Sequence, residues 1–271
     1  MSIEIKTPEQ IAVMREAGLV VARTLRVLAA AVRPGVTTAE LDGIAEAEIR
    51  GAGATPSFKG YHGYPATICT SVNEEIVHGI PSPRRSLRDG DIISIDCGAI
   101  VDGWHGDAAL TVPVGEITQE DQALLDACEK ALWAGIARAR PGGRLGDVSS
   151  AVERSVTGSG RYGIVRQYTG HGIGSQMHMP PDIPNFGMPG TGPWLVPGMA
   201  LAIEPMITRG GEDTIELADG WSVVTADASR AAHFEHTVAI TPDGPWVLTA
   251  EHFDTERLRS TPAPPGDSSA R

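Results

Sequence analysis

The chain is poor in cysteine and lacks long apolar runs, and each shortage excludes a class of protein. Its 271 residues include three cysteines with no CxxC spacing, which provide neither a disulfide framework nor a zinc knuckle and fit a reducing compartment. No window approaches the roughly eighteen consecutive apolar residues of a membrane span, and the N-terminus has no signal-peptide pattern. The sequence therefore predicts a soluble, cytoplasmic protein with no membrane partner.

Positive charge is also scarce. Lys and Arg number 22 against 34 Asp and Glu, which gives a net charge of −12. A surface that tracks phosphates needs a local excess of basic residues, so nucleic acid is not the expected substrate, although Arg84, Arg85 and Arg88 form a local basic group.

Several catalytic motifs are missing as well. The sequence contains no Walker A, GxSxG or HExxH string, so a P-loop enzyme, a serine hydrolase and a thermolysin-like protease lose their usual support. A GxGxxG string at residues 158–163 follows a predicted helix instead of a strand, which indicates a loop.

Helix-capping patterns predict four helices between short β-rich runs. Thr7-Pro8 with Gln10 begins a helix that ends before Arg33, and Thr37 with Glu40 begins a second that ends at Gly51. A third is expected from Thr118 and a fourth around 148–156, with strands at 91–100, 199–207 and 234–240. The predicted fold class is α+β, with one catalytic domain over residues 1–258 and a disordered tail over 259–271.

The chain also contains an internal repeat. Residues 87–96 align without gaps on residues 195–204, an offset of 108, and Arg33-Pro34-Gly35 matches residues 140–142 at an offset of 107. Two near-equal offsets favour a duplicated half, although chance agreement of turn-and-strand patterns is the alternative. Both copies of the longer repeat end in a carboxylate.

The first of these carboxylates, Asp96, ends an apolar run. A buried acid must be paired, hydrogen-bonded or bound to a metal, because an isolated buried carboxylate is too costly to keep ionised. Asp102-Gly103 predicts a two-residue hairpin turn that places Asp107 opposite Gly98, with Asp96 as its diagonal neighbour on the same face. We expect Gly98 to leave that face uncrowded.

The second half offers a similar set. Glu204 ends the repeated strand, Glu235 interrupts an alternating strand, and His171 lies in a glycine-rich string. Four carboxylates with one neutral imidazole would balance two divalent cations, and this oxygen-rich ligation suits Mn, Fe, Co or Zn. Each acid taken alone is equally well explained as a surface residue.

Together these residues resemble the type I methionine aminopeptidases. Five residues match the metal ligands of that family in order and spacing: Asp96, Asp107, His171, Glu204 and Glu235. Surrounding strings also match, at residues 60–65, 73–81, 102–107, 169–174 and 203–205, and the resemblance spans about residues 3–250.

The resemblance implies a pita-bread fold, in which two pseudo-twofold-related halves surround a central antiparallel sheet. It implies removal of the initiator Met from nascent polypeptides when the second residue is small, by water activated between two divalent metals. Asp107 and Glu235 would bridge the metals, Asp96 would bind one, and His171 and Glu204 would bind the other. Glu204 would also shuttle a proton.

The resemblance assigns substrate contacts too. His178 would hydrogen-bond the scissile peptide and the developing oxyanion, and His78 would lie near the peptide nitrogen. Four residues resemble the wall of the methionine pocket, although core packing explains them equally well: Tyr61, Tyr64, Cys69 and Trp221. Phe58 and Met177 depart from the usual residues and put the pocket shape in question. The other histidines keep an ordinary surface or core interpretation: His62, His105, His233 and His236.

Two other functions are compatible with the ligand set. Prolidase and aminopeptidase P use the same ligands but carry a large N-terminal domain, for which Asp96 comes too early. A non-catalytic binding module would typically lack some ligands. The expected form is the minimal bacterial one, a monomer acting on nascent N-termini, with the ribosome as a partner that no basic run identifies.

Overall fold

A computed structural model describes residues 2–252 of the chain. Met1 and residues 253–271 lie outside this part, and with them the predicted tail and the predicted boundary at residue 258. Four α-helices are present at the predicted places: α1 (Pro8–Ala31), α2 (Thr38–Gly51), α3 (Gln119–Arg138) and α4 (Leu145–Ser159). One 3-10 turn, η1, covers Tyr61–Gly63.

Threonine caps explain three of the helix starts. Thr7, Thr37 and Thr118 are the N-cap residues of α1, α2 and α3, and each side chain accepts a hydrogen bond from the backbone N–H three residues later. In α1 and α2 the residue at that position completes a capping box. The sequence signals for these helices are therefore confirmed at the level of individual hydrogen bonds.

Within residues 2–252 the strands form four antiparallel groups. The first contains β1 (Thr55–Pro56), β2 (Ile68–Val72), β4 (Ile92–Val101) and β5 (Trp104–Pro113). A five-stranded group contains β7 (Gly170–Gly172), β8 (Met179–Ile183), β9 (Ala200–Ile203), β14 (His236–Thr241) and β15 (Gly244–Val247). One three-stranded group contains β6 (Gly163–Ile164), β10 (Met206–Thr208) and β13 (Ala231–His233). The other contains β3 (Glu75–Val77), β11 (Thr214–Glu216) and β12 (Val223–Thr225).

The hairpin of β4 and β5 has the predicted register. Asp102 and Gly103 both have positive φ, as a tight two-residue turn requires. Asp107 is paired with Gly98 and Asp96 with Ala109. The two aspartates are therefore diagonal neighbours on one face of the sheet, as the turn signal predicted.

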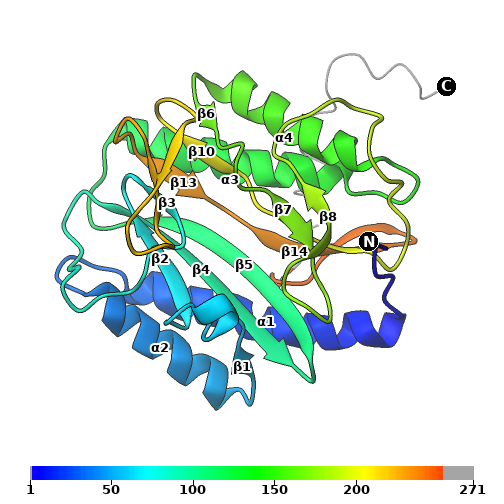
Figure 1. The fold of residues 1–271 in the computed structure, drawn as a ribbon, viewed down its shortest axis with the longest axis horizontal. Coiled ribbons are helices and arrows are strands. Elements are labelled where there is room, and N and C mark those ends of the chain that lie inside the picture. Colours follow the sequence, from blue (N-terminus) through cyan, green and yellow to red (C-terminus); the bar gives the residue numbers. More distant parts are fainter. Residues whose placement is uncertain (1, 253–271) are drawn as a thin grey trace.

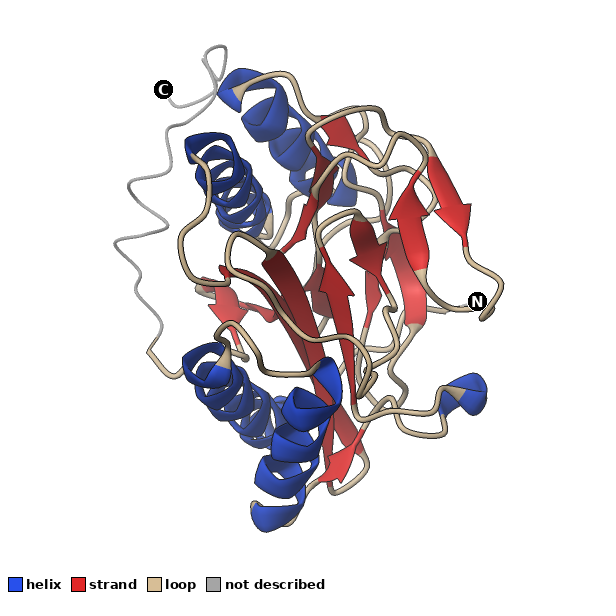
Figure 2. Ribbon diagram, turned by 90° about the vertical axis from the view of Figure 1, so that its left-hand side faces the viewer, coloured by secondary structure: helices blue, strands red, loops and turns tan. Residues whose placement is uncertain are grey.

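The duplicated half is visible as a repeated hydrogen bond. In the first half the N–H of Gly35 donates to the carbonyl of Leu87, over 2.8 Å, and in the second the N–H of Gly142 donates to that of Leu195, over 2.9 Å. Figure 1 shows the matching arrangement, with α1 and α2 along one edge, α3 and α4 along the opposite edge, and the long strands between them. In Figure 2 the helix pairs lie on one side of the strands.

Two strands that the sequence predicted as continuous are interrupted. The run 199–207 divides into β9 and β10 at Glu204-Pro205, and the run 234–240 begins only after Glu235. Pro205 has no N–H for the ladder and restricts the residue before it. β9 pairs with β14 in the five-stranded group, whereas β10 pairs with β13 in a three-stranded group. Both glutamates therefore lie at the joints where the chain passes from one of these groups to the other.

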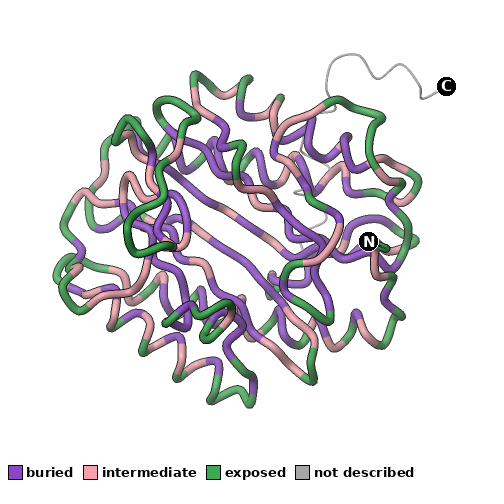
Figure 3. Tube along the Cα trace, viewed as in Figure 1, coloured by how far each residue is buried: buried purple, intermediate pink, exposed green. Residues whose placement is uncertain are grey.

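The core lies between the helices and the strands of each half. Buried side chains form separate clusters around α1 with α2 and around α3 with α4. Figure 3 shows the buried trace along the central strands and the exposed trace in the outer loops. Within residues 2–252, no helix combines the length and the apolarity needed to cross a membrane.

Candidate metal centre

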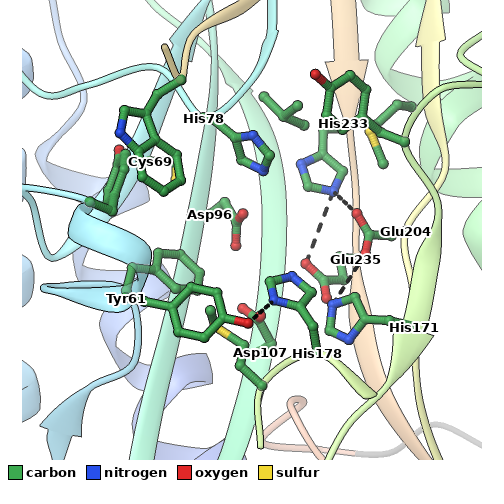
Figure 4. Close-up of a pocket in the computed structure, with 17 residues that line it drawn as sticks. Tyr61, Cys69, His78, Asp96, Asp107, His171, His178, Glu204, His233 and Glu235 are labelled. Carbon is green, nitrogen blue, oxygen red and sulfur yellow. Dashed lines mark hydrogen bonds and ion pairs between the residues drawn. The ribbon is translucent and has the colours of Figure 1, made fainter. Parts of the chain in front are cut away.

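A cavity opens where the central strands of the two halves meet. Backbone hydrogen bonds between Ala109 and Glu235, in both directions, join β5 to the β13–β14 junction. The hydroxyl of Thr237 also accepts from the N–H of Asp107 and donates to its carbonyl. The cavity, of about 130 Å³, is lined by residues from both halves (Figure 4).

All five predicted ligands line this cavity. Asp107, His171 and Glu235 each offer a ligand atom within 4.8 Å of the other two. Asp96 and Glu204 line the same cavity outside that compact group of three. β4 and β5 supply the two aspartates, β7 supplies the histidine, and the two strand joints supply the glutamates. The interruption of the strands thus directs both glutamate side chains into the site.

The carboxyl groups strongly perturb one another. Burial, followed by the charges of Glu235 and Asp96, raises the pKa of Asp107 well above its usual value. Burial also raises the pKa of Asp96, to about 7, and that of Glu204 and Glu235 well above their usual value. Such a concentration of buried acids stays ionised only where positive charge compensates it.

The polar atoms of these acids support a cation as the missing partner. Among the described residues, Asp96 Oδ1, Asp107 Oδ1 and Glu235 Oε1 are buried without a hydrogen-bond partner. Carboxylate oxygens with one imidazole are a donor set that divalent transition metals accept. The residues present therefore fit divalent cations.

His171 is held in a tautomer suited to metal binding. Its Nδ1 lies 3.0 Å from the carbonyl oxygen of Gly172 and donates to it, which leaves Nε2 as the acceptor, 3.4 Å from Glu204 Oε1. Burial and the neighbouring His178 lower the pKa of His171 to about 3. The ring is therefore neutral, as a ligand must be.

The two predicted substrate histidines also line the cavity, from different elements. His178 follows the β7 strand, its ring centre 4.2 Å from that of His171, and its Nδ1 lies 3.0 Å from the hydroxyl of Tyr61. His78 follows β3 with a positive φ of 61°, a strained conformation that is common at functional sites. Burial lowers the pKa of His78 to about 4.

The four predicted pocket-wall residues lie together. Tyr61, Tyr64, Cys69 and Trp221 all line the cavity, and the rings of Tyr64 and Trp221 meet edge to face at 5.0 Å. Phe58 and Met177, the two departures from the family pattern, belong to the same apolar cluster.

One detail of the sequence interpretation was wrong. Gly98 does not leave an open face, because a Cβ at this position would lie 2.8 Å from side-chain atoms of both Phe58 and Ser57. The glycine is needed because the segment at Ser57 packs directly over β4. That contact brings Phe58 into the cavity.

Sequence reasoning missed four lining residues: Val77, Tyr168, Met206 and His233. His233 is the most informative, since its buried Nε2 lies 3.7 Å from Glu204 Oε2 and 4.0 Å from Glu235 Oε2. Its position two residues before Glu235 in an alternating strand was the available signal. The ordinary interpretation holds for His62, which is exposed, and for His236, whose Nδ1 pairs with Thr249.

The fold and the site together define a metal-dependent hydrolase with a pita-bread fold. The sequence pattern of metallopeptidase family M24 matches residues 12–242. The chain is 56% identical to methionine aminopeptidase 1 of Mycobacterium tuberculosis, over 87% of this chain and 91% of that protein, and 51% identical to methionine aminopeptidase 1 of Bacillus subtilis, over 90% and 98%. The chain belongs to the methionine aminopeptidases of metallopeptidase family M24.

Solved structures agree with this fold. The crystal structure of methionine aminopeptidase from Thermotoga maritima superposes with a TM-score of 0.91 at 43% identity, covering 92% of this chain and 100% of that one. Prolidase from Pyrococcus furiosus superposes with a TM-score of 0.71 at 21% identity, covering 92% of this chain and 66% of that one. The prolidase likeness extends to the fold alone.

Proposed function

We propose that this chain removes the N-terminal methionine from nascent polypeptides whose second residue is small. The observation that carries the proposal is the placement of a compact Asp107–His171–Glu235 group beside an apolar wall in one cavity. A metal site supplies the hydrolytic chemistry, and the neighbouring wall suits an unbranched apolar side chain such as that of methionine. We also propose residues 1–258 as the catalytic domain, acting as a cytoplasmic monomer, and the ribosome as a partner.

The proposed centre would hold two divalent cations, with Co, Mn, Fe and Zn as the candidates. Asp107 and Glu235 would contact both cations, Asp96 would bind one, and His171 and Glu204 would bind the other. Divalent cations held there would polarise the scissile carbonyl and make water a stronger nucleophile at neutral pH.

Side chains of this protein would carry out the remaining steps. Glu204 is 12% exposed at its side chain and faces the imidazoles of His171 and His233, so it is placed to accept a proton and return it to the leaving amine. His178, with Nδ1 tied to Tyr61, would donate from its other nitrogen to the developing oxyanion. His78 would contact the peptide nitrogen.

The test measures metal content and turnover on one sample. Protein stripped with a chelator would be titrated with Mn, Co, Fe and Zn separately, while hydrolysis of a Met-Ala peptide and bound metal per chain are followed. We expect no turnover before metal is added and recovery that follows occupancy. Full turnover in stripped protein would contradict the proposal.

A further inference from the structure

The segment before the first helix contacts the loop that carries His178. Residues 4–6, called here the N-terminal latch, directly precede Thr7, the N-cap of α1. Residues 173–178, called here the β7–β8 loop, connect the strand of His171 to β8. The two segments are far apart in the sequence.

Glu4 joins the latch to the loop. Its Oε1 accepts a hydrogen bond from the hydroxyl of Ser175 over 2.7 Å, and its Oε2 lies 3.3 Å from the N–H of the same residue. Both oxygens of one carboxylate therefore bind one loop residue, which fixes position and orientation better than a single bond does.

Lys6 fixes the carboxylate in turn. Its ammonium lies 3.5 Å from Glu4 Oε2 and 3.3 Å from the carbonyl of Glu4, and the lysine side chain is only 2% exposed. Burial lowers the pKa of Lys6. A buried ammonium is costly without its partner, so Lys6 and Glu4 depend on each other.

Packing keeps the latch against the loop. A Cβ at Gly174 would clash with Lys6 and with the Glu4 carboxylate. The N–H of Lys6 donates to the carbonyl of Gly198 over 2.8 Å, and a Cβ at Gly198 would lie 2.6 Å from the Ile5 side chain. The chain has glycines where the latch passes closest.

The opposite side of the loop forms part of the cavity. Met177 is 3% exposed within the apolar wall, and His178 reaches Tyr61 (Figure 4). Only Gln176 separates Ser175, which the latch holds, from Met177. A shift of Ser175 would therefore displace both residues that the loop contributes to the cavity.

We infer that Glu4 is a positioning residue for catalysis, which holds the β7–β8 loop so that His178 is placed against the substrate. This inference rests on the proposed function, since it acts through His178. Lys6 and Ser175, which both contact Glu4, take part in the same positioning of the loop.

Replacing Glu4 tests the inference. Glu4→Gln keeps the size of the side chain but removes the charge that Lys6 needs, and Ser175→Ala removes the strongest bond to the loop. Misplacement of a catalytic group by a fraction of an ångström lowers turnover strongly, so we expect kcat on a Met-Ala peptide to fall about 5- to 50-fold with a smaller change in KM.

The control is Glu48→Gln. Glu48 also pairs with one cation, Arg23, at 3.3 Å, and its side chain is 28% exposed against 30% for Glu4. Kinetics unchanged from wild type are expected for this variant. An equal loss of kcat in Glu48→Gln would overturn the inference, because any lost ion pair would then explain the result.

A double-mutant cycle separates positioning from general destabilisation. In a His178→Ala background, Glu4→Gln should change kcat less than about twofold, because the group that it positions is gone. The full loss in that background would overturn the inference. All rates are compared well below the melting temperature of each variant.

Hydrogen exchange provides a readout independent of activity. Amides of residues 173–178 should exchange faster in Glu4→Gln than in wild type, while those of β4 remain unchanged. Unchanged exchange in the loop would overturn the inference. Failure of the wild-type enzyme to cleave Met-Ala would instead contradict the proposed function, and the exchange result would still report on the latch.

Discussion

Buried acids that lie close together dominate the chemistry of individual residues in this protein. Asp107 is 4% exposed and Glu235 is 2% exposed, and each raises the electrostatic cost of ionising its neighbours. In the proposed metal site these same carboxylates would instead stabilise the folded protein, because bound cations offset their charge. A substitution at such a position should therefore raise the melting temperature without metal and lower it with metal.

Asp107→Asn should make this reversal measurable. In chelator-treated protein the variant should melt at a higher temperature than wild type, because one buried carboxylate has been removed from the group. In excess Mn it should melt at a lower temperature and be inactive. Differential scanning calorimetry under both conditions provides the comparison, and a variant that is less stable than wild type in chelator as well would contradict this account.

His178→Ala should separate chemistry from metal binding. The variant should bind Mn like wild type while kcat/KM falls about 10- to 1000-fold, the range for one lost transition-state hydrogen bond. His252→Ala, at an exposed histidine, serves as the control. Kinetics like those of wild type in His178→Ala would remove this residue from the mechanism.

At the scale of elements, close approach of helix and strand determines where glycine is required. α1 crosses β5 so closely that a Cβ at Gly106 would lie 2.7 Å from the backbone nitrogen of Gly18. A Cβ at Gly18 would in turn clash with the backbone of Leu248. By contrast, a Cβ at Gly43 in the middle of α2 would meet no heavy atom within 4 Å.

Two alanine substitutions should therefore change the free energy of unfolding in opposite directions. Gly18→Ala should lower the free energy of unfolding by about 1–3 kcal/mol, because the backbone of α1 must move away from that of Leu248. Gly43→Ala should raise it by up to about 1 kcal/mol, because alanine favours the helix and nothing is displaced. Urea denaturation of both variants measures the difference, and a stabilised Gly18→Ala would contradict the packing described here.

The sequence predicted elements well where the signal was local. The caps at Thr7 and Thr37 and the turn at Asp102-Gly103 depend on neighbouring residues alone, and each has the expected geometry. The strand breaks beside Glu204 and Glu235 were not predicted, since they arise from a change of pairing partner along the chain. The reason for Gly98 was also missed, because it depends on a segment about forty residues earlier.

At the scale of the whole molecule, the site lies where the two related halves meet, a contact called here the seam. Asp96 and Asp107 come from the first half, and His171, Glu204 and Glu235 come from the second. The internal repeat anticipated this arrangement, although the likeness to known ligands was needed to identify His171. Cations at the seam should stabilise both halves together.

Metal removal should therefore lower the stability of the whole chain. A ligand present at a hundredfold excess over its Kd stabilises the folded state by about 2.7 kcal/mol. We expect one cooperative unfolding transition that moves to lower temperature on chelation and returns when Mn is added. Calorimetry that shows the same melting temperature with and without metal would contradict cations at the seam.

The central claim is best tested by competition among peptides. Equal amounts of peptides beginning Met-Ala, Met-Ser, Met-Leu and Ala-Pro would be incubated with the Mn-loaded protein and followed by mass spectrometry. We expect loss of methionine from Met-Ala and Met-Ser far faster than from Met-Leu, because steric exclusion of a bulky second residue exceeds the roughly 1–3 kcal/mol of a single methylene. Preferential cleavage of Ala-Pro would contradict the claim and assign a proline-specific peptidase to the same metal site.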